Sequence, residues 1–252
     1  MRRSIPLLAF LLAGCAATIE TEPPEPSVVP DYRPTREIRQ YRLIDTIILD
    51  DAERRWIVSP RKILELSGEF FSVEYAAEEG IAGTITAIDQ DATRLWIGTT
   101  RALQVLEKDR GFIHTFIEER GLDVRYVASL TEDFGIALMS RGAALIDAPS
   151  LSMEIFPLPD VDVRDVTDTI FYGEDLWVGT TRGLRRFSVP FKHWNASYGS
   201  KALARAAVVR LEAAQTVNPN TGQVIAVELY AVTAGDVFVY RPSLDTWERV
   251  GF

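Results

Sequence analysis

The stretch Leu95-Trp96-Ile97-Gly98-Thr99-Thr100-Arg101-Ala102-Leu103 decides the fold, because it recurs almost unchanged as Leu176-Trp177-Val178-Gly179-Thr180-Thr181-Arg182-Gly183-Leu184. The two copies lie 81 residues apart, close to twice forty, which predicts a copy midway. Gly135-Ile136-Ala137-Leu138-Met139-Ser140-Arg141-Gly142-Ala143 fills that place, and Arg55-Trp56-Ile57-Val58-Ser59-Pro60-Arg61 stands one period earlier. The arginines at 61, 101, 141 and 182 are therefore spaced by 40, 40 and 41 residues. A period near forty with strand-like content is typical of β-propeller blades.

Each period reads as four short strands separated by turn residues. In the second unit we expect strands at 85–89, 94–99, 103–107 and 112–116. The sequence thus predicts an all-β fold, a small propeller of five four-stranded blades over residues 41–252, with blades at about 41–80, 81–121, 122–162, 163–197 and 198–252. Residues 37–43 are expected to add an edge strand that helps to close the ring.

Side chains of the repeat have predictable structural roles. Trp56, Trp96, Trp177 and Tyr230 are expected to pack between neighbouring blades, because large aromatic side chains bury most area there. Gly98 and Gly179 are expected to permit close approach of the next blade. The fifth unit is stretched, with extra residues inside 198–222 where a helical turn at 202–207 is possible.

The composition of the chain argues against several classes of function and site. The 252-residue chain carries a formal net charge of −9, which argues against general nucleic-acid binding. Its single cysteine excludes an intrachain disulfide. With two histidines and no cysteine in the body, no metal and no cofactor are expected, since Cys/His zinc sites need such ligands.

The first forty residues are expected to contain a targeting signal followed by a linker. Met1-Arg2-Arg3 is basic, and the apolar run Ile5 to Leu12 is too short to span a bilayer, which favours a signal peptide over residues 1–14. Residues 15–40 hold prolines and acids but few large apolar side chains, so we expect an extended linker.

Leu12-Ala13-Gly14-Cys15 resembles the lipobox of bacterial lipoproteins. The resemblance implies cleavage before Cys15 and lipidation of that residue, hence a membrane partner reached through the lipid anchor. Loss of Arg2 and Arg3 with the leader would leave a mature net charge of −11. Ala16 at the next position resembles the pattern of outer-membrane sorting, which places the body in the cell envelope, facing the periplasm.

The Leu-Trp-Ile/Val-Gly-Thr core, followed by Arg-Gly/Ala-Leu and an aromatic strand, is similar to the two-component-regulator propeller repeat. That resemblance covers about residues 41 to 252 and implies a β-propeller. The chain shows no kinase or output segment, so sensor signalling is not carried over with the fold.

Two basic groups are candidate sites for an anionic ligand or an acidic partner. The first is the set of repeated turn arginines, Arg61, Arg101, Arg141 and Arg182, which a closed propeller presents on one face. Acidic residues of the neighbouring loops, such as Glu118-Glu119, could neutralise these arginines. The second lies between Asp175 and Glu212, where the chain has no acid. Besides Arg182 it holds Arg185, Arg186, Lys192, Lys201, Arg205 and Arg210.

These patterns predict a non-catalytic docking or ligand-binding lipoprotein whose partner is an envelope protein or an anionic glycan. The alternative from another class is a carbohydrate-active or other hydrolytic propeller that uses channel carboxylates, for which Asp45 and Asp168 lie in or beside inner strands. No nucleophile elbow, phosphate loop or His-Glu-x-x-His pattern occurs.

Overall fold

The computed structural model describes residues 41–42, 45–51, 54–68, 71–195, 203–217 and 224–250. Within these ranges every regular element is a β-strand except one short 3-10 turn, η1 (Val163–Asp165). Cys15 and Lys201 lie outside the described residues. No helix in the described ranges is both long and apolar enough to cross a membrane.

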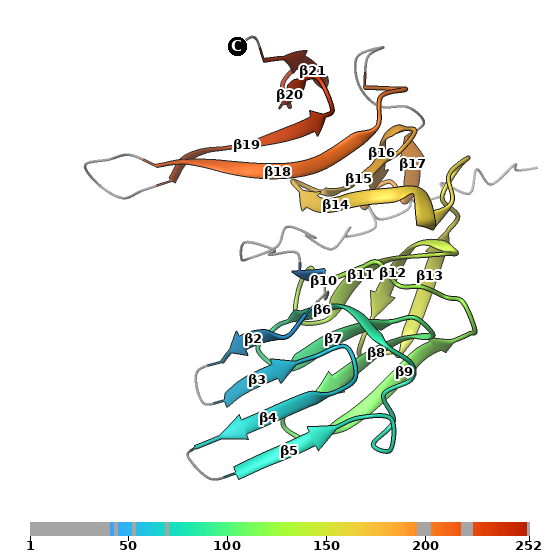
Figure 1. Ribbon diagram of the computed structural model, residues 1–252, viewed down its shortest axis with the longest axis vertical. Coiled ribbons are helices and arrows are strands. Elements are labelled where there is room, and N and C mark those ends of the chain that lie inside the picture. Colours follow the sequence, from blue (N-terminus) through green and yellow to red (C-terminus); the bar gives the residue numbers. More distant parts are fainter. Residues whose placement is uncertain are drawn as a thin grey trace, which may run out of the picture. The chain divides into compact units, whose positions relative to one another are not determined.

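The strands form five antiparallel sheets, which confirms the predicted fold class. We number the sheets blades 1 to 5 in chain order (Figure 1). Blade 1 holds β2 (Ile47–Asp50), β3 (Arg54–Val58), β4 (Ile63–Ser67) and β5 (Phe71–Tyr75). Blade 2 holds β6 (Ile85–Gln90), β7 (Arg94–Thr99), β8 (Ala102–Glu107) and β9 (Phe112–Glu118).

The remaining blades repeat this up-and-down order. Blade 3 holds β10 (Tyr126–Ser129), β11 (Phe134–Met139), β12 (Gly142–Asp147) and β13 (Ser152–Phe156). Blade 4 holds β14 (Val166–Tyr172), β15 (Asp175–Thr180), β16 (Gly183–Ser188) and β17 (His193–Asn195). Blade 5 holds β18 (Val208–Val217), β19 (Val224–Thr233), β20 (Val237–Arg241) and β21 (Thr246–Arg249).

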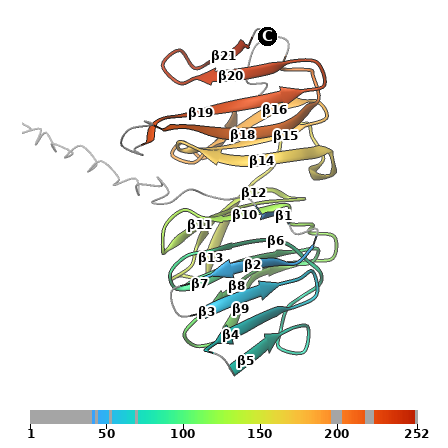
Figure 2. The same ribbon diagram turned by 60° about the vertical axis from the view of Figure 1, so that its left-hand side comes forward.

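Four hydrophobic cores join the blades in sequence order. One core lies between each pair of successive blades, and Figure 2 shows the sheets stacked face to face in this order. No core cluster of the described residues joins blade 1 to blade 5. The expected edge strand is present as β1 (Tyr41–Arg42), but it pairs with β6 of blade 2 and therefore does not link the two ends of the array.

The repeated tryptophans lie in these cores, as predicted. Trp56, Trp96 and Trp177 have no exposed area and point toward blades 2, 3 and 5 respectively. Tyr230 was expected to do the same in blade 5, and that prediction is wrong. Its ring lies on the side away from blade 4, where its hydroxyl donates to Glu228 at 2.7 Å and no core cluster of the described residues includes it.

The repeated glycines let the next blade approach closely. A Cβ on Gly98 would stand 2.5 Å from a methyl group of Val124, and a Cβ on Gly179 would stand 2.9 Å from a methyl group of Val208. Each valine belongs to the entry of the following blade. The predicted role of both glycines is thus present in the structure.

The threonine that ends the repeated core fixes the turn after it. Thr99 Oγ1 accepts hydrogen bonds from the backbone amides of Arg101 and Ala102, and Thr180 Oγ1 accepts one from Arg182. Thr233 of blade 5 accepts the same kind of bond from Asp236. The arginine of the repeat is therefore placed by its neighbour threonine on an exposed turn.

Blade 5 uses its extra length in a way the sequence did not reveal. Its first two strands, β18 and β19, have ten residues each, so their hairpin projects beyond the neighbouring β14 (Figure 1). The helical turn expected at 202–207 does not appear among the described residues, since a turn at 203–205 leads into β18.

Candidate functional site

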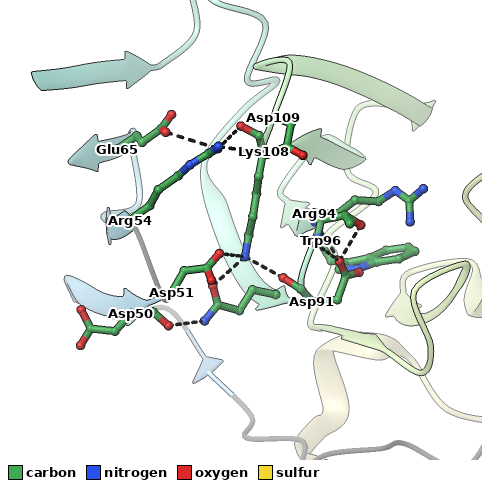
Figure 3. A network of polar contacts seen from close by, with 11 residues as sticks. Asp50, Asp51, Arg54, Glu65, Asp91, Arg94, Trp96, Lys108 and Asp109 are labelled. Atoms are coloured by element: carbon green, nitrogen blue, oxygen red, sulfur yellow. Dashed lines mark hydrogen bonds and ion pairs between the residues drawn. The ribbon is translucent and has the colours of Figure 1, made fainter. Parts of the chain in front are cut away.

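The acidic turns between the first two strands of blades 1 and 2 take part in contacts between these two blades. Buried Lys108 of blade 2 donates from Nζ to Asp51 of blade 1 at 2.7 Å and to the backbone of Asp91 at 2.6 Å (Figure 3). Arg54 of blade 1 reaches the backbone carbonyl of Lys108 and the carboxylate of Asp109. These contacts assign the Asp50–Asp51 and Asp89–Asp91 turns to blade packing. No group of three metal-binding side chains occurs among the described residues.

Three of the four turn arginines pair with nearby acids. Arg101 lies 2.8 Å from Glu118, Arg141 lies 3.4 Å from Glu119, and Arg182 lies 3.8 Å from Asp165. All three arginine side chains are more than half exposed, so each ion pair is weak and exchangeable. Arg61 is exposed on the corresponding turn of blade 1. The structure thus gives an exposed rim of alternating charges.

The second basic group divides into buried and exposed members. Arg186 is 17% exposed, lies 2.6 Å from Asp175 and 2.8 Å from Asp245, and stacks over Trp177. It therefore connects blades 4 and 5. Burial raises the pKa of Asp175 even though Arg186 opposes the shift. Both ion pairs hold the Arg186 guanidinium between blades 4 and 5.

The other described members of that group make separate contacts. Arg185 bonds to the backbone carbonyl of Leu184 at 3.1 Å, and burial lowers the pKa of its guanidinium. Lys192 lies 2.8 Å from Glu154 and so bridges blades 4 and 3. Arg205 is exposed.

A pocket of about 280 Å³ brings together basic groups that the sequence left apart. It opens beside the first strands of blades 4 and 5 and is lined by Arg125, Val166, Thr167, Asp168, Thr169, Arg210 and Leu211. Arg125 comes from the entry to blade 3 and pairs with Asp123 at 2.6 Å. Arg210 of β18 is about two-thirds exposed and lies 3.2 Å from Glu212. Two guanidinium groups at one polar hollow suit a carboxylate ligand.

Asp168 accepts hydrogen bonds from the backbone of two other residues that line this pocket. One of its oxygens accepts the backbone amide of Leu211 at 2.7 Å, and the other accepts the amide of Thr169 at 2.9 Å. Asp168 thus connects the first strands of blades 4 and 5. Asp45, its possible partner in hydrolysis, is exposed and accepts the backbone amide of Thr46 at 2.8 Å.

Arg125 is the site residue that sequence reasoning missed, although a signal was present. It ends Asp123-Val124-Arg125, which recurs as Asp162-Val163-Arg164 at the entry to blade 4. In both copies the valine is buried and the aspartate binds the arginine. Hydrogen bonds from Arg164 lower the pKa of Asp162 to about 2. The motif stands outside the Leu-Trp-Ile-Gly-Thr core and was therefore overlooked.

Comparison with known proteins supports the fold. No family model matches the chain, and no curated protein matches it. Among solved structures it is similar to the extracellular domain of the putative one component system BT4673 from B. thetaiotaomicron, with 19% identity and a TM-score of 0.52 over 86% of this chain and 30% of that one. It thus spans less than a third of that protein domain's length.

Two further structures resemble it. PorZ, a surface component of the type-IX secretion system of Porphyromonas gingivalis, is 12% identical with a TM-score of 0.53, over 84% of this chain and 28% of that one. YCF48 bound to D1 peptide is 12% identical with a TM-score of 0.53, over 86% of this chain and 74% of that one. At these identities the likeness shows the propeller-type fold alone.

Proposed function

We propose that this chain is a non-catalytic binding module of the bacterial cell envelope that docks a carboxylate-bearing ligand. The observation that carries the proposal is the pocket at which Arg125 and Arg210 meet. The repeated aromatic cores build a rigid scaffold, and the pocket lies where three successive blades contribute their first strands or the residues before them. Sites on such scaffolds are often formed by loops and strand ends.

The arginines are able to exchange partners at low cost. Arg210 is well exposed, and its contact with Glu212 is a surface ion pair that contributes little to stability. A ligand carboxylate that replaces Glu212 keeps the charge balance and gains a bidentate geometry. Thr167 and Thr169 supply polar atoms on the pocket wall. The acidic side of a protein partner and a uronate-containing glycan both offer this chemistry.

The proposal is tested by calorimetric titration with two probes, an oligoglutamate peptide and a glucuronate-containing oligosaccharide, at low salt. We expect one probe to bind, and Arg125→Gln with Arg210→Gln to weaken that binding at least tenfold, because a hydrogen bond to a charged group contributes about 1.5–3 kcal/mol. Arg110→Gln is the matched control, since Arg110 is an exposed arginine outside the pocket. Binding that survives the double replacement, or no binding of either probe, would refute the assignment.

Envelope location and lipid anchoring through Cys15 belong to the same proposal and rest on the lipobox-like leader. Similarity of fold to extracellular and surface bacterial proteins supports this placement. Metabolic labelling with an alkyne fatty acid in a bacterial host tests the anchor. The chain should incorporate the label, and the Cys15→Ser variant should not; equal labelling of the two would exclude Cys15 as the acceptor.

A further inference from the structure

The exposed apolar side chains of the array gather at one end of its sheets. In each antiparallel blade, the turn between the first two strands and the turn between the last two strands lie at the same end. We call the surface formed by these turns the turn face. Lys108 of blade 2 bonds Asp51 of blade 1 there (Figure 3). Arg94 of blade 2 reaches the backbone carbonyl of Glu132 in blade 3, so the turn face runs on from blade to blade.

The turns between the last two strands present an apolar side chain to solvent in blades 2 to 5. Leu151, Phe191 and Leu244 lie in these turns, and Phe112 is the first residue after one. All four side chains are more than half exposed, and Phe191 is 77% exposed. The turns share a positive φ at their last residue, which is in chain order Gly111, Leu151, Lys192 and Asp245. An exposed apolar side chain is thus a recurrent feature of this blade edge.

The hairpin of β18 and β19 adds a longer uncharged element to the turn face. The hydroxyl of Tyr172, at the end of β14, donates to the backbone carbonyl of Val227 at 2.7 Å. The hairpin residues beyond Val227 therefore project past blade 4 (Figure 1). Residues 213–227 contain no charged side chain, although charged residues make up 25% of the chain. Val224 and Val227 are both exposed, so this projecting segment suits a less polar environment than water.

Large apolar side chains are much rarer on the rest of the surface. Of the eight that are well exposed among the described residues, six lie at the turn face, four at the turns and two on the hairpin. The other two are Ile48 on blade 1 and Val209 at the opposite end of blade 5. The turns at that opposite end expose the repeated arginines instead. The two ends of the sheets thus suit different surroundings.

The apolar side chains of the turns stand singly and not as one continuous patch. Lys192 follows Phe191, and Arg110 stands two residues before Phe112. A protein partner is recognised through a close-packed centre of the interface, whereas fluid lipid closes around separate side chains. Phenylalanine and leucine together with basic residues are typical of segments that lie in a membrane interface. The pattern therefore favours a lipid surface as the partner.

Acidic residues of the turn face decide which lipids it meets. Asp109, Glu132, Asp133 and Glu174 are exposed on its turns, and anionic headgroups repel such residues. We propose that the turn face lies on a zwitterionic lipid surface, with the apolar turns of blades 2 to 5 and the β18–β19 hairpin at headgroup level. This inference rests on the proposed envelope location, which brings the chain to a membrane.

This orientation leaves the proposed ligand pocket open. Arg125 precedes β10, and Arg210 lies near the start of β18, so the pocket is at the end of the sheets opposite to the turn face. A carboxylate ligand would then approach from the side away from the lipid. Membrane contact and ligand binding use separate residues, and each is measured without the other.

The first test places a fluorophore that is sensitive to polarity at each end of the sheets. The full chain with Cys15→Ser is held by an N-terminal histidine tag on phosphatidylcholine vesicles that contain a nickel-chelating lipid, so attachment does not depend on lipidation. A label at Phe191→Cys should shift its emission to the blue and be quenched by nitroxide lipids. The control, Ser140→Cys on an exposed turn at the opposite end, should show neither change. Attachment without quenching at residue 191, or equal quenching at both residues, would overturn the proposal, and the former would favour a protein partner.

The second test uses a label at Leu244→Cys in the same attached chain to report contact with lipid. Phe112→Ser with Phe191→Ser should lower the equilibrium constant for contact by at least about tenfold, because the free energy of burying two phenylalanines is lost. Ile48→Ser is the matched control, an exposed apolar residue outside the turn face, and should leave the constant unchanged. Circular dichroism checks folding. Equal constants for the two variants, or stronger contact after phosphatidylglycerol replaces part of the phosphatidylcholine, would contradict a zwitterionic lipid partner. Failure of Cys15 lipidation appears only in the fatty-acid labelling and leaves both tests unaffected.

Discussion

Blades 1 and 5 end the array in opposite ways. The face of blade 1 that points away from blade 2 carries the apolar row Ile48, Ile57 and Leu64. The face of blade 5 that points away from blade 4 is polar instead: Tyr230 bonds to Glu228, and Arg241 pairs with Glu228 and Glu248. The two blades share their strand order with every blade between them. The contrast shows that a propeller repeat fixes the sheet but not the surface that the sheet presents.

The same repeat position therefore has different consequences at different places. Trp96 has a following blade to pack against, but Tyr230 does not. Gly98 makes room for the next blade, and Val232 stands at that position in blade 5. Replacing the two members of each pair and comparing the losses of stability therefore tests the difference between blades 2 and 5.

The largest expected effect separates the two aromatic positions. Trp96→Ala should lower the free energy of unfolding by about 3–5 kcal/mol, because it leaves a cavity in the core between blades 2 and 3. Tyr230→Ala should cost about 1 kcal/mol, since the ring is half exposed. Urea denaturation followed by circular dichroism measures both. Equal losses would mean that another blade covers Tyr230.

The next largest effect concerns the position at which Gly98 lets blade 3 approach blade 2. Gly98→Val should destabilise the fold by about 1–3 kcal/mol, because the new side chain overlaps Val124. Val232→Ala at the equivalent place should cost less than about 1 kcal/mol, since no blade packs there. Denaturation midpoints give the comparison. A harmless Gly98→Val would show that blades 2 and 3 lie farther apart than described.

Polar contacts between blades should outweigh those on the outer face. Lys108→Ala removes the buried ammonium that bonds Asp51, Gln90 and the backbone of Asp91, and it should cost about 2 kcal/mol. Arg241→Ala removes more exposed ion pairs and should cost less than about 1 kcal/mol. The reverse order of the two losses would place the stabilising network at blade 5.

The smallest effect concerns the exposed Asp162–Arg164 pair. The pKa of Asp162 lies at about 2, below its ordinary 3.8, so its contribution to stability is fully present above pH 3.8 and is lost as pH falls toward 2. NMR titration of the Asp162 carboxyl carbon should show this low pKa, and Arg164→Gln should return it toward 3.8. An unchanged titration in Arg164→Gln would show that the bonds do not form in solution.

The interior of the fold was predictable because the sequence repeats there. The tryptophans at 56, 96 and 177 and the two glycines lie at blade interfaces, and the repeated arginines lie on equivalent exposed turns. Each depends on neighbours that also repeat. When a residue and its contacts recur together, the contacts of one copy predict the contacts of the others.

The site was less predictable because its residues come from different parts of the repeat. Arg125 precedes a first strand, whereas Arg210 lies within one, so no single spacing joins them. The ion pair of Arg186 is with Asp245 in another blade, 59 residues away. The prediction for Tyr230 was wrong because its burial depends on a neighbouring sheet, and no described sheet packs on that side of blade 5. Contacts between blades, rather than the period, determine such residues.

The central claim is that blades 1 and 5 do not pack on each other, and one distance measurement tests it directly. Nitroxide labels at Ser72 and Glu248 lie on the two outer faces, and pulsed electron resonance reports their separation in a Cys15→Ser background under dilute, monomeric conditions. Packed sheets lie about 10 Å apart, so a closed ring requires a population of labels within about 20 Å. We predict that no such short distance is present. A dominant distance in that range would show that the two ends meet and would contradict the account.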